Sequence, residues 1–344
     1  MARILLVGNF AHKSMGLWCY NSDRRIQNGL LRNNNLVWDF SDRDVARASN
    51  IFANRKLGVR ATNKKLLQTI ENLRPDIIIL GHANIIKSDT LAQAKKTWPH
   101  LRIGVFNFDP LFNRDNVRAL ESRMDVADAI FITSAGEGLR KFKTATNIVG
   151  YLPNPVDPAI DSGRAFAKTD QPFDIFHCIG APESPSDPRL THIEFLLQNF
   201  PDLRIDYYGL LGNPNILGGA YLDALQNNAR IGLNISRRND IPWYCSDRAA
   251  HLFGNGLLVA VPETIGWRHF FTDQEAVFFQ SPAELGEKIT AMKNDDARRQ
   301  VVAEAGWKKY YALFNSQAVT KYMLEMITGQ KLDPSYPWAK EVYA

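Results

Sequence analysis

Short, continuous apolar runs alternate with amphipathic stretches along the first half of the chain. A run of four to eight apolar residues is typical of a strand that is buried on both faces of a parallel sheet. The predicted strands are residues 2–8, 36–40, 76–82, 102–109, 128–133 and 146–151. The predicted helices are residues 22–32, 61–75, 88–98, 113–124 and 136–143, whereas the 20 residues after the second strand are polar and irregular.

The alternation stops at Tyr151–Pro158, where three prolines in eight residues predict a stiff, extended linker. It then restarts, with predicted strands at residues 173–180, 203–209, 231–235, 257–261 and 275–280. The predicted helices of this half are residues 189–199, 221–228, 246–253, 267–271, 283–294, 296–313 and 317–328. Strands that alternate with helices indicate a doubly wound α/β domain on each side of the linker.

We therefore predict an α/β protein with two doubly wound, Rossmann-like domains that face each other across a cleft. The first domain is expected over residues 1–152 and the second over residues 153–328. The C-terminal helices are able to pack back on the first domain. The tail, residues 329–344, is aromatic and is expected to return toward that domain.

Composition excludes several classes of protein. No apolar run approaches the roughly 18 residues that a membrane-spanning helix needs, and the start of the chain is typical of a first strand rather than a signal peptide. Cys19, Cys178 and Cys245 stand alone without CxxC spacing, which fits a reducing compartment. We expect a cytoplasmic protein, with peripheral contact at the inner membrane face.

The net charge of +5 conceals an asymmetry. Residues 1–150 hold 23 Lys and Arg against 13 Asp and Glu, a net charge of +10, which leaves the rest of the chain at −5. A basic first half predicts an anionic partner, such as a phospholipid surface, a lipid-phosphate carrier or an acidic glycan. The basic residues are scattered and no nucleic-acid motif is present, so nucleic acid is not an expected partner.

Candidate chemistry gathers in residues 230–266, whose pattern predicts strand, polar loop, helix, glycine break and strand. Loops after the carboxyl ends of parallel strands form the ligand crevice of such sheets. The residues that this places near a crevice are Ser236, Arg237, Arg238, Asp247, Arg248 and His251. Arginine suits phosphate, because its guanidinium fork matches the phosphate oxygens. Each residue also has a structural interpretation, as a helix cap, a solvated turn or a half-buried histidine.

Several catalytic motifs are absent from the chain. It has no GxGxxG, GxxxxGK[ST], GxSxG or HExxH sequence, which argues against NAD enzymes, P-loop NTPases, serine hydrolases and zinc proteases. Asp42-Arg43-Asp44 spells a DxD motif, the pattern of some metal–nucleotide sites, but it lies in an irregular charged stretch. A solvated loop is the favoured interpretation there, so we predict no metal and no cofactor.

Three segments together resemble one family of enzymes. YLPNPVD (151–157) is similar to the interdomain segment of GT-B glycosyltransferases of the family-4 type. DIPWYCSDR (240–248) with HLFGNGLLVAVPE (251–263) resembles the pattern of the CgeB-like, spore-maturation-protein-type branch. EAVFFQSPAELGEKI (275–289), followed by ARRQVVAEAGWKKYYALFN (297–315), resembles the closing stretch of the same branch. The resemblance covers most of residues 151–328.

The resemblance implies a nucleotide-sugar donor in the second domain, an acceptor on the first and no essential metal. The donor contacts that it suggests are Gly180, Gly209, Ser236, Arg237, Asp247 and Arg248. Glycines at strand ends allow close approach of the backbone, and a helix N-terminus near Ser246 would favour the diphosphate. One departure is His251, which stands where the family usually carries a ribose-binding Glu.

Glycosyl transfer with inversion needs a base for the acceptor hydroxyl, from the first domain. Asp109 is our first candidate, at the end of a predicted strand, followed by His82 and by Glu137. A retaining enzyme would not require such a base, and an Asp-Pro pair can simply begin a turn.

The predicted function is transfer of a sugar from a nucleotide donor to a glycan, lipid-linked or cell-surface polymer acceptor, as in bacterial envelope polysaccharide synthesis. Two alternatives stay open. A sugar-nucleotide epimerase would share the two-domain fold, and a degenerate GT-B protein would bind glycan or a partner protein without turnover. A tandem solute-binding protein is disfavoured because no signal peptide is apparent.

Overall fold

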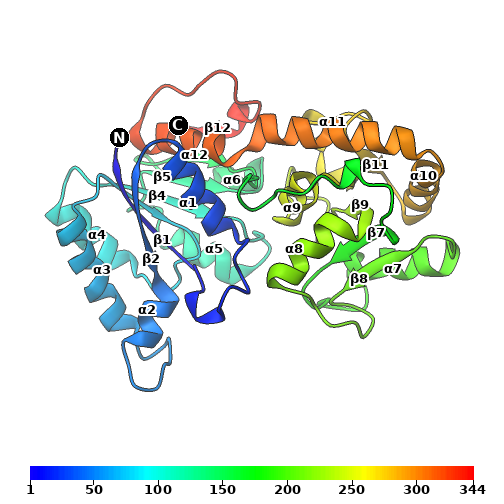
Figure 1. Cartoon of the computed structure of the whole chain (residues 1–344). Coiled ribbons are helices and arrows are strands. Elements are labelled where there is room, and N and C mark those ends of the chain that lie inside the picture. The colour runs from blue at the N-terminus through cyan, green and yellow to red at the C-terminus, as the bar shows by residue number, and fades with distance from the viewer. The chain divides into compact units, whose positions relative to one another are not determined.

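The computed structural model describes residues 1–344, which divide into two compact units (Figure 1). Unit 1 comprises Met1–Pro155 and Ser316–Ala344, and unit 2 comprises Val156–Asn315. The chain therefore passes between the units twice. No helix in the structure is both long and apolar enough to cross a bilayer.

Unit 1 is built on a seven-stranded sheet with the strand order β12-β6-β5-β4-β3-β1-β2. Its strands are β1 (Arg3–Gly8), β2 (Leu36–Ser41), β3 (Ile77–Leu80), β4 (Arg102–Asn107), β5 (Ala129–Ile132), β6 (Ile148–Tyr151) and β12 (Val342–Tyr343). All neighbours are parallel except β12, which runs antiparallel to β6. Every residue of β3 and β5 is buried, as their continuous apolar runs require.

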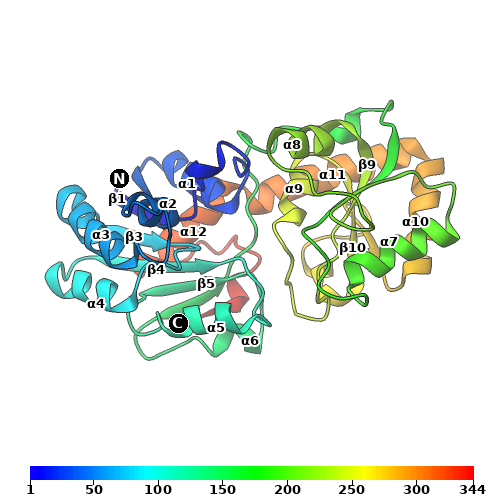
Figure 2. The ribbon, with the colours of Figure 1, turned by 90° about the horizontal axis from the view of Figure 1, so that it is seen from below.

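The helices of unit 1 are α1 (Ser22–Arg32), α2 (Asp42–Ala48), α3 (Val59–Leu73), α4 (Ser88–Thr97), α5 (Arg114–Glu121), α6 (Glu137–Arg140) and α12 (Ser316–Thr328), with short 3-10 turns η1 (His12–Ser14) and η5 (Ala339–Glu341). α1 lies beside α12, and α3 lies beside α4 (Figures 1 and 2). The order of the strands reverses at β1. Right-handed crossovers then place α1 and α3 on opposite faces of the sheet.

Unit 2 has a five-stranded, wholly parallel sheet with the order β11-β10-β9-β7-β8. Its strands are β7 (Phe173–Cys178), β8 (Ile205–Tyr208), β9 (Ala229–Leu233), β10 (Leu258–Pro262) and β11 (Val277–Phe279). Its helices are α7 (Pro188–Asn199), α8 (Gly218–Asn227), α9 (Arg248–Gly254), α10 (Pro282–Asn294) and α11 (Asp296–Phe314), with η2 (Ala165–Ala167), η3 (Glu263–Ile265) and η4 (Trp267–His269). Aliphatic side chains from β7, β9, β10, α7 and α10 form its core.

Residues 41–60 are not wholly irregular, as the sequence pattern predicted, because α2 occupies seven of them. Two carboxylates in its first turn suit the positive end of the helix. Asp42 is also buried and accepts a hydrogen bond from the backbone N–H of Ile85 at 2.9 Å. This tertiary contact, which no local pattern reveals, helps to hold so short a helix.

α12 belongs to unit 1, although the predicted second domain extended to residue 328; the sequence analysis did allow the C-terminal helices to pack back on the first domain. Two glycines on strands make room for it. A Cβ on Gly104 would lie 2.4 Å from Ile327, and a Cβ on Gly150 would lie 2.2 Å from the hydroxyl of Tyr322. The tail packs on α12, because Trp338 is fully buried and its ring makes an edge-to-face contact with the ring of Tyr322, with the ring centroids 5.5 Å apart. β12 then pairs with β6, so the tail returns to unit 1.

Candidate active site

The strand order of unit 2 reverses between β7 and β9, and ligands of doubly wound sheets bind at such a reversal, beyond the carboxyl ends of the strands. The buried guanidinium of Arg248, the first residue of α9, occupies this point. Its Nε donates to the carbonyl oxygen of Cys178 at 3.1 Å and its Nη1 to that of Ile235 at 2.7 Å. Burial lowers the pKa of Arg248 from its usual value. Arg248 thus joins the ends of two strands while holding positive charge at the reversal.

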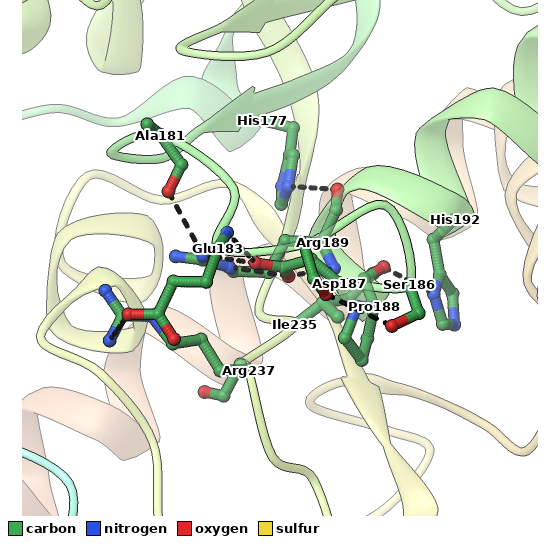
Figure 3. A network of polar contacts seen from close by, with 12 residues as sticks. His177, Ala181, Glu183, Ser186, Asp187, Pro188, Arg189, His192, Ile235 and Arg237 are labelled. Atoms are coloured by element: carbon green, nitrogen blue, oxygen red, sulfur yellow. Dashed lines mark hydrogen bonds and ion pairs between the residues drawn. The ribbon is translucent and has the colours of Figure 1, made fainter. Parts of the chain in front are cut away.

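The loop after β7 is held by an ion pair that the sequence interpretation missed. Asp187 caps α7 and accepts from Arg189 Nε at 2.9 Å and from Arg189 Nη2 at 2.5 Å. Arg189 also donates to the carbonyl of Ala181 at 3.4 Å, across the loop (Figure 3). Burial opposes ionisation of Asp187, but the hydrogen bonds from Arg189 lower its pKa to about 2. The sequence did offer a signal for this residue pair. Asp-Pro-Arg before an apolar helix is typical of a helix N-cap, which Asp187 provides here.

His177 lies beneath this loop and is fully buried. Its Nε2 lies 3.1 Å from the carbonyl oxygen of Arg189, and Figure 3 shows the ring directed toward that group. Burial, together with the nearby charge of Arg248, lowers the pKa of His177 to about 3. The histidine is therefore neutral at physiological pH.

Arg237 is the accessible arginine of the site. Its side chain keeps 35% of its surface exposed, and its Nη1 lies 2.7 Å from Glu183 Oε1 in the loop after β7. Figure 3 shows the two side chains approaching each other from the loops after β7 and β9. Arg238 instead pairs with Asp240 in the solvent, as a turn residue would. A surface ion pair such as Arg237–Glu183 is weak, and an anionic ligand can replace it.

The other predicted donor contacts have varied surroundings. Gly180 is exposed, and a Cβ there would meet nothing within 4 Å. Gly209 has φ +79°, and its Cβ would lie 2.1 Å from the carbonyl oxygen of Ile179, so close packing of two strand ends explains this glycine. Ser236 is buried, and its N–H and C=O both bond to the side chain of Asn239, at 2.8 and 3.0 Å.

Asp247 and His251 lie one turn apart on α9. Asp247 is the N-cap residue by position, but its side chain makes no capping hydrogen bond and is 48% exposed. His251 is buried, with its ring edge-on against Tyr221 at 5.4 Å and its Nε2 3.8 Å from Asp247 Oδ2. Asp247, not His251, is therefore the accessible polar group of this pair.

In unit 1, three titratable side chains meet at the carboxyl ends of β1, β3 and β4. His82 Nε2 lies 3.2 Å from Asp109 Oδ2, and His82 Nδ1 lies 3.9 Å from Asp23 Oδ2. Burial disfavours the imidazolium, but hydrogen bonds from the ring to Asp109 and Asp23, and their charges, raise the pKa of His82 to about 10. His82 is consequently protonated at neutral pH.

Asp23 was not among the predicted residues. It is buried in the first turn of α1 and accepts from the N–H of Asn9 at 3.2 Å. Its carboxylate lies so close to two strand ends that a Cβ on Gly8 or Gly81 would approach Asp23 Oδ1 to 2.7 or 2.4 Å. The sequence held a signal for Asp23. Two strands are followed or ended by a glycine, and an acidic residue lies in the first turn of the helix after the first of them.

A small pocket opens beside the His82–Asp109 pair, lined among others by Asn84, Asn116 and Arg123. Glu137, the third candidate, lies on α6, 84% exposed and 3.0 Å from Arg140, and it does not line this pocket.

The DxD carboxylates are engaged elsewhere. Asp44 accepts from the backbone N–H of His12 at 2.8 Å and from the Ser41 hydroxyl at 2.5 Å, while Asp42 bonds to Ile85. No group of three or more His, Cys, Asp or Glu side chains lies where it could hold a metal ion.

Comparison with solved structures identifies the fold as GT-B. The chain is similar to Anabaena HepE in complex with UDP and glucose, with a TM-score of 0.59 at 14% identity over 96% of this chain and 100% of that one. It is also similar to sucrose-phosphate synthase from Thermosynechococcus elongatus, with a TM-score of 0.61 at 13% identity over 96% and 99% of the two chains.

A third solved structure is the UDP-forming α,α-trehalose-phosphate synthase of Burkholderia xenovorans, with a TM-score of 0.57 at 12% identity over 97% of this chain and 100% of that one. Residues 189–325 match the family model described as glycosyl transferase-like, which confirms the prediction of a glycosyltransferase domain. A search of curated proteins finds no match to the chain. The predicted CgeB-like branch stays a prediction.

Proposed function

We propose that this protein transfers a sugar from a nucleotide-sugar donor, without a metal ion, to a glycan, lipid-linked or cell-surface polymer acceptor. The observation that carries the proposal is the convergence of Arg237, Arg248 and Arg189 at the strand reversal of unit 2. Asp187 neutralises Arg189. The charge that favours a diphosphate there therefore comes from Arg248 and from Arg237, whose surface pair with Glu183 a ligand can replace. The GT-B fold and the family match support the same reaction.

The donor is proposed to be a uridine diphosphate sugar. HepE, to which this chain is similar, has been solved with UDP, with UDP and glucose, and with UDP-glucose. In this chain Gly180 leaves open space beside the loop after β7, and Arg237 can release Glu183 to bind a phosphate. Of the other predicted contacts, we propose that the accessible Asp247 faces the same donor, whereas Ser236 and His251 are buried.

On the acceptor side we propose that Asp109 removes the proton from the attacking hydroxyl. Its carboxylate is 44% exposed, while the protonated His82 beside it holds the carboxylate in one orientation. A protonated imidazole cannot itself accept a proton, so the base of this pair is the carboxylate. Asp23 keeps His82 charged from the buried side, and Glu137 is retained as a separate candidate.

Thermal unfolding with a panel of ligands tests the donor site. UDP at 100 times its dissociation constant should stabilise the protein by about 2.7 kcal/mol, whereas GDP and ADP at equal concentration should not. Arg237→Ala should abolish the UDP shift without changing the melting temperature of the free protein.

The matched control is Arg204→Ala. Arg204 also pairs with a carboxylate, Asp174 at 3.6 Å, but at the amino end of β8, the opposite edge of the same sheet. This variant should keep the whole UDP shift. No shift with any nucleotide would overturn the proposal in favour of a degenerate binding protein, and isomerised donor without acceptor would favour an epimerase.

A further inference from the structure

One loop of unit 1 presents apolar side chains directly to solvent. Between α2 and α3 all of residues 51–57 are exposed, and Ile51 and Phe52 keep 93% and 74% of their surface accessible. Leu57, at the other end of the same stretch, is 61% exposed. Figure 1 shows this segment, residues 50–57, projecting beyond α2 at the edge of unit 1. We call it the 50–57 loop.

The backbone of the 50–57 loop is held in place. Asn50 Nδ2 donates to the carbonyl oxygens of Ala46 at 2.9 Å and Asn54 at 2.8 Å, and the N–H of Asn54 donates back to Asn50 Oδ1 at 3.1 Å. At the base of the loop, a Cβ on Gly58 would lie 1.9 Å from the carbonyl oxygen of Ala46. These hydrogen bonds fix the backbone on both sides of Ile51 and Phe52, whose side chains remain exposed.

Exposed apolar side chains are concentrated on this part of the chain. Ten of the 13 large hydrophobic residues that are exposed lie within residues 1–57. A second group follows η1, where Met15, Leu17 and Trp18 are 89%, 48% and 41% exposed. The backbone N–H of His12 in η1 donates to Asp44 of α2. The helix that precedes the 50–57 loop therefore contacts the turn that precedes this second group.

Basic residues are concentrated in the sequence around the apolar tip. Residues 42–65 contain seven Lys and Arg but only two acids. Both acids are engaged, because Asp42 is buried and Asp44 bonds to His12 and Ser41. Arg55, Lys56 and Arg60 are exposed and form no ion pair. Exposed apolar side chains next to unpaired cations match the chemistry of an anionic lipid surface, where acyl chains lie beneath negative headgroups.

We propose that the 50–57 loop docks this protein on an anionic lipid bilayer. Ile51 and Phe52 enter the boundary between headgroups and acyl chains, and Arg55, Lys56 and Arg60 contact the negative headgroups. The loop projects from unit 1 (Figure 1), and a bilayer needs no complementary groove to receive it. The contact goes beyond nucleotide-sugar transfer and does not depend on it, because the loop contains none of the candidate site residues.

Sedimentation with vesicles tests the proposal in the absence of any nucleotide. The full chain should sediment with vesicles of mixed phosphatidylcholine and phosphatidylglycerol but not with phosphatidylcholine alone, and binding should weaken as salt rises. The double variant Ile51→Ser/Phe52→Ser should bind the mixed vesicles on the order of tenfold more weakly, through loss of buried apolar surface. Arg55→Gln/Lys56→Gln should remove most of the salt dependence.

Val301→Ser is the matched control, because Val301 is 68% exposed on α11 of unit 2 and lies outside the loop. It should bind vesicles like the wild type, and all variants should keep the same melting temperature and UDP shift.

No binding of the wild type to mixed vesicles, or equal binding by the double serine variant, would overturn the proposal. Self-association that the double variant abolishes would assign the loop to a second copy of the chain instead. Absence of a UDP-induced thermal shift would contradict the proposed sugar transfer, but it would not contradict membrane docking by the 50–57 loop.

Discussion

The guanidinium of Arg248 donates to the carbonyl oxygen of Cys178 across the strand reversal of unit 2, at 3.1 Å. The same side chain bonds to Ile235 at the end of the neighbouring strand, and it is buried. Arg248 is therefore part of the framework of the candidate donor site, whereas Arg237 is the arginine that a ligand can reach.

Arg248→Ala should destabilise the protein by about 2–4 kcal/mol, because it leaves two buried carbonyl groups without donors. Urea unfolding followed by tryptophan fluorescence measures this. Arg298→Ala, at an exposed position of α11, should change the unfolding free energy by less than about 0.5 kcal/mol. An unchanged midpoint for Arg248→Ala, with UDP binding lost, would show that Arg248 serves the ligand rather than the strands.

Asp109→Asn should lower kcat by about 100-fold or more while preserving the UDP-induced thermal shift, because it removes the base but not the donor site. His82→Gln should also lower kcat, since it removes the cation that orients Asp109. Initial rates of UDP release with a responsive acceptor provide the measurement. Asp115→Asn is the control, as Asp115 is an 85% exposed carboxylate paired with Arg118. Loss of activity in Glu137→Gln alone, with Asp109→Asn active, would reassign the base.

Asp42→Asn should stabilise the protein at pH 8 but not at pH 4. Burial raises the pKa of Asp42 to about 6, against the opposing effects of the Ile85 N–H and of Arg43. Since this folded-state pKa lies above the usual carboxyl value, ionisation costs stability progressively as pH rises from about 4 through 6. The gain at pH 8 should be on the order of 1–3 kcal/mol. Urea unfolding at both pH values checks it, and equal gains at both would contradict a role for ionisation.

Gly29→Ala should destabilise unit 1 by about 1–3 kcal/mol through overpacking. The new Cβ would lie 2.1 Å from the carbonyl oxygen of Ser316, so α1 and α12 would have to move apart. Gly219→Ala on α8 is the matched control, because its Cβ would meet nothing within 4 Å. Alanine in that helix should be neutral or stabilise by up to about 1 kcal/mol. Thermal unfolding of both variants gives the comparison.

The strands were predictable because a buried parallel strand needs a continuous apolar run. Ile77–Leu80 and Leu258–Pro262 are buried at every position, and each was predicted at that place. Helix α2 was not predicted, because its seven residues depend on Asp42 reaching Ile85, 43 residues away. The assignment of α12 likewise depends on Gly104 and Gly150, whose missing side chains leave room for a helix far along the chain.

The candidate site likewise has features that the local sequence predicts and features that depend on tertiary contacts. By itself the sequence determined which polar residues follow which strands: it brought Arg237, His82 and Asp109 to strand ends, and Arg248 to the start of the next helix. Only the tertiary structure decided that Arg248 is buried on two carbonyls while Arg237 stays accessible, and that Asp23 and Asp109 keep His82 charged. The physical reason is that strand periodicity is local, whereas desolvation and ion pairing depend on atoms that the chain brings together from distant positions.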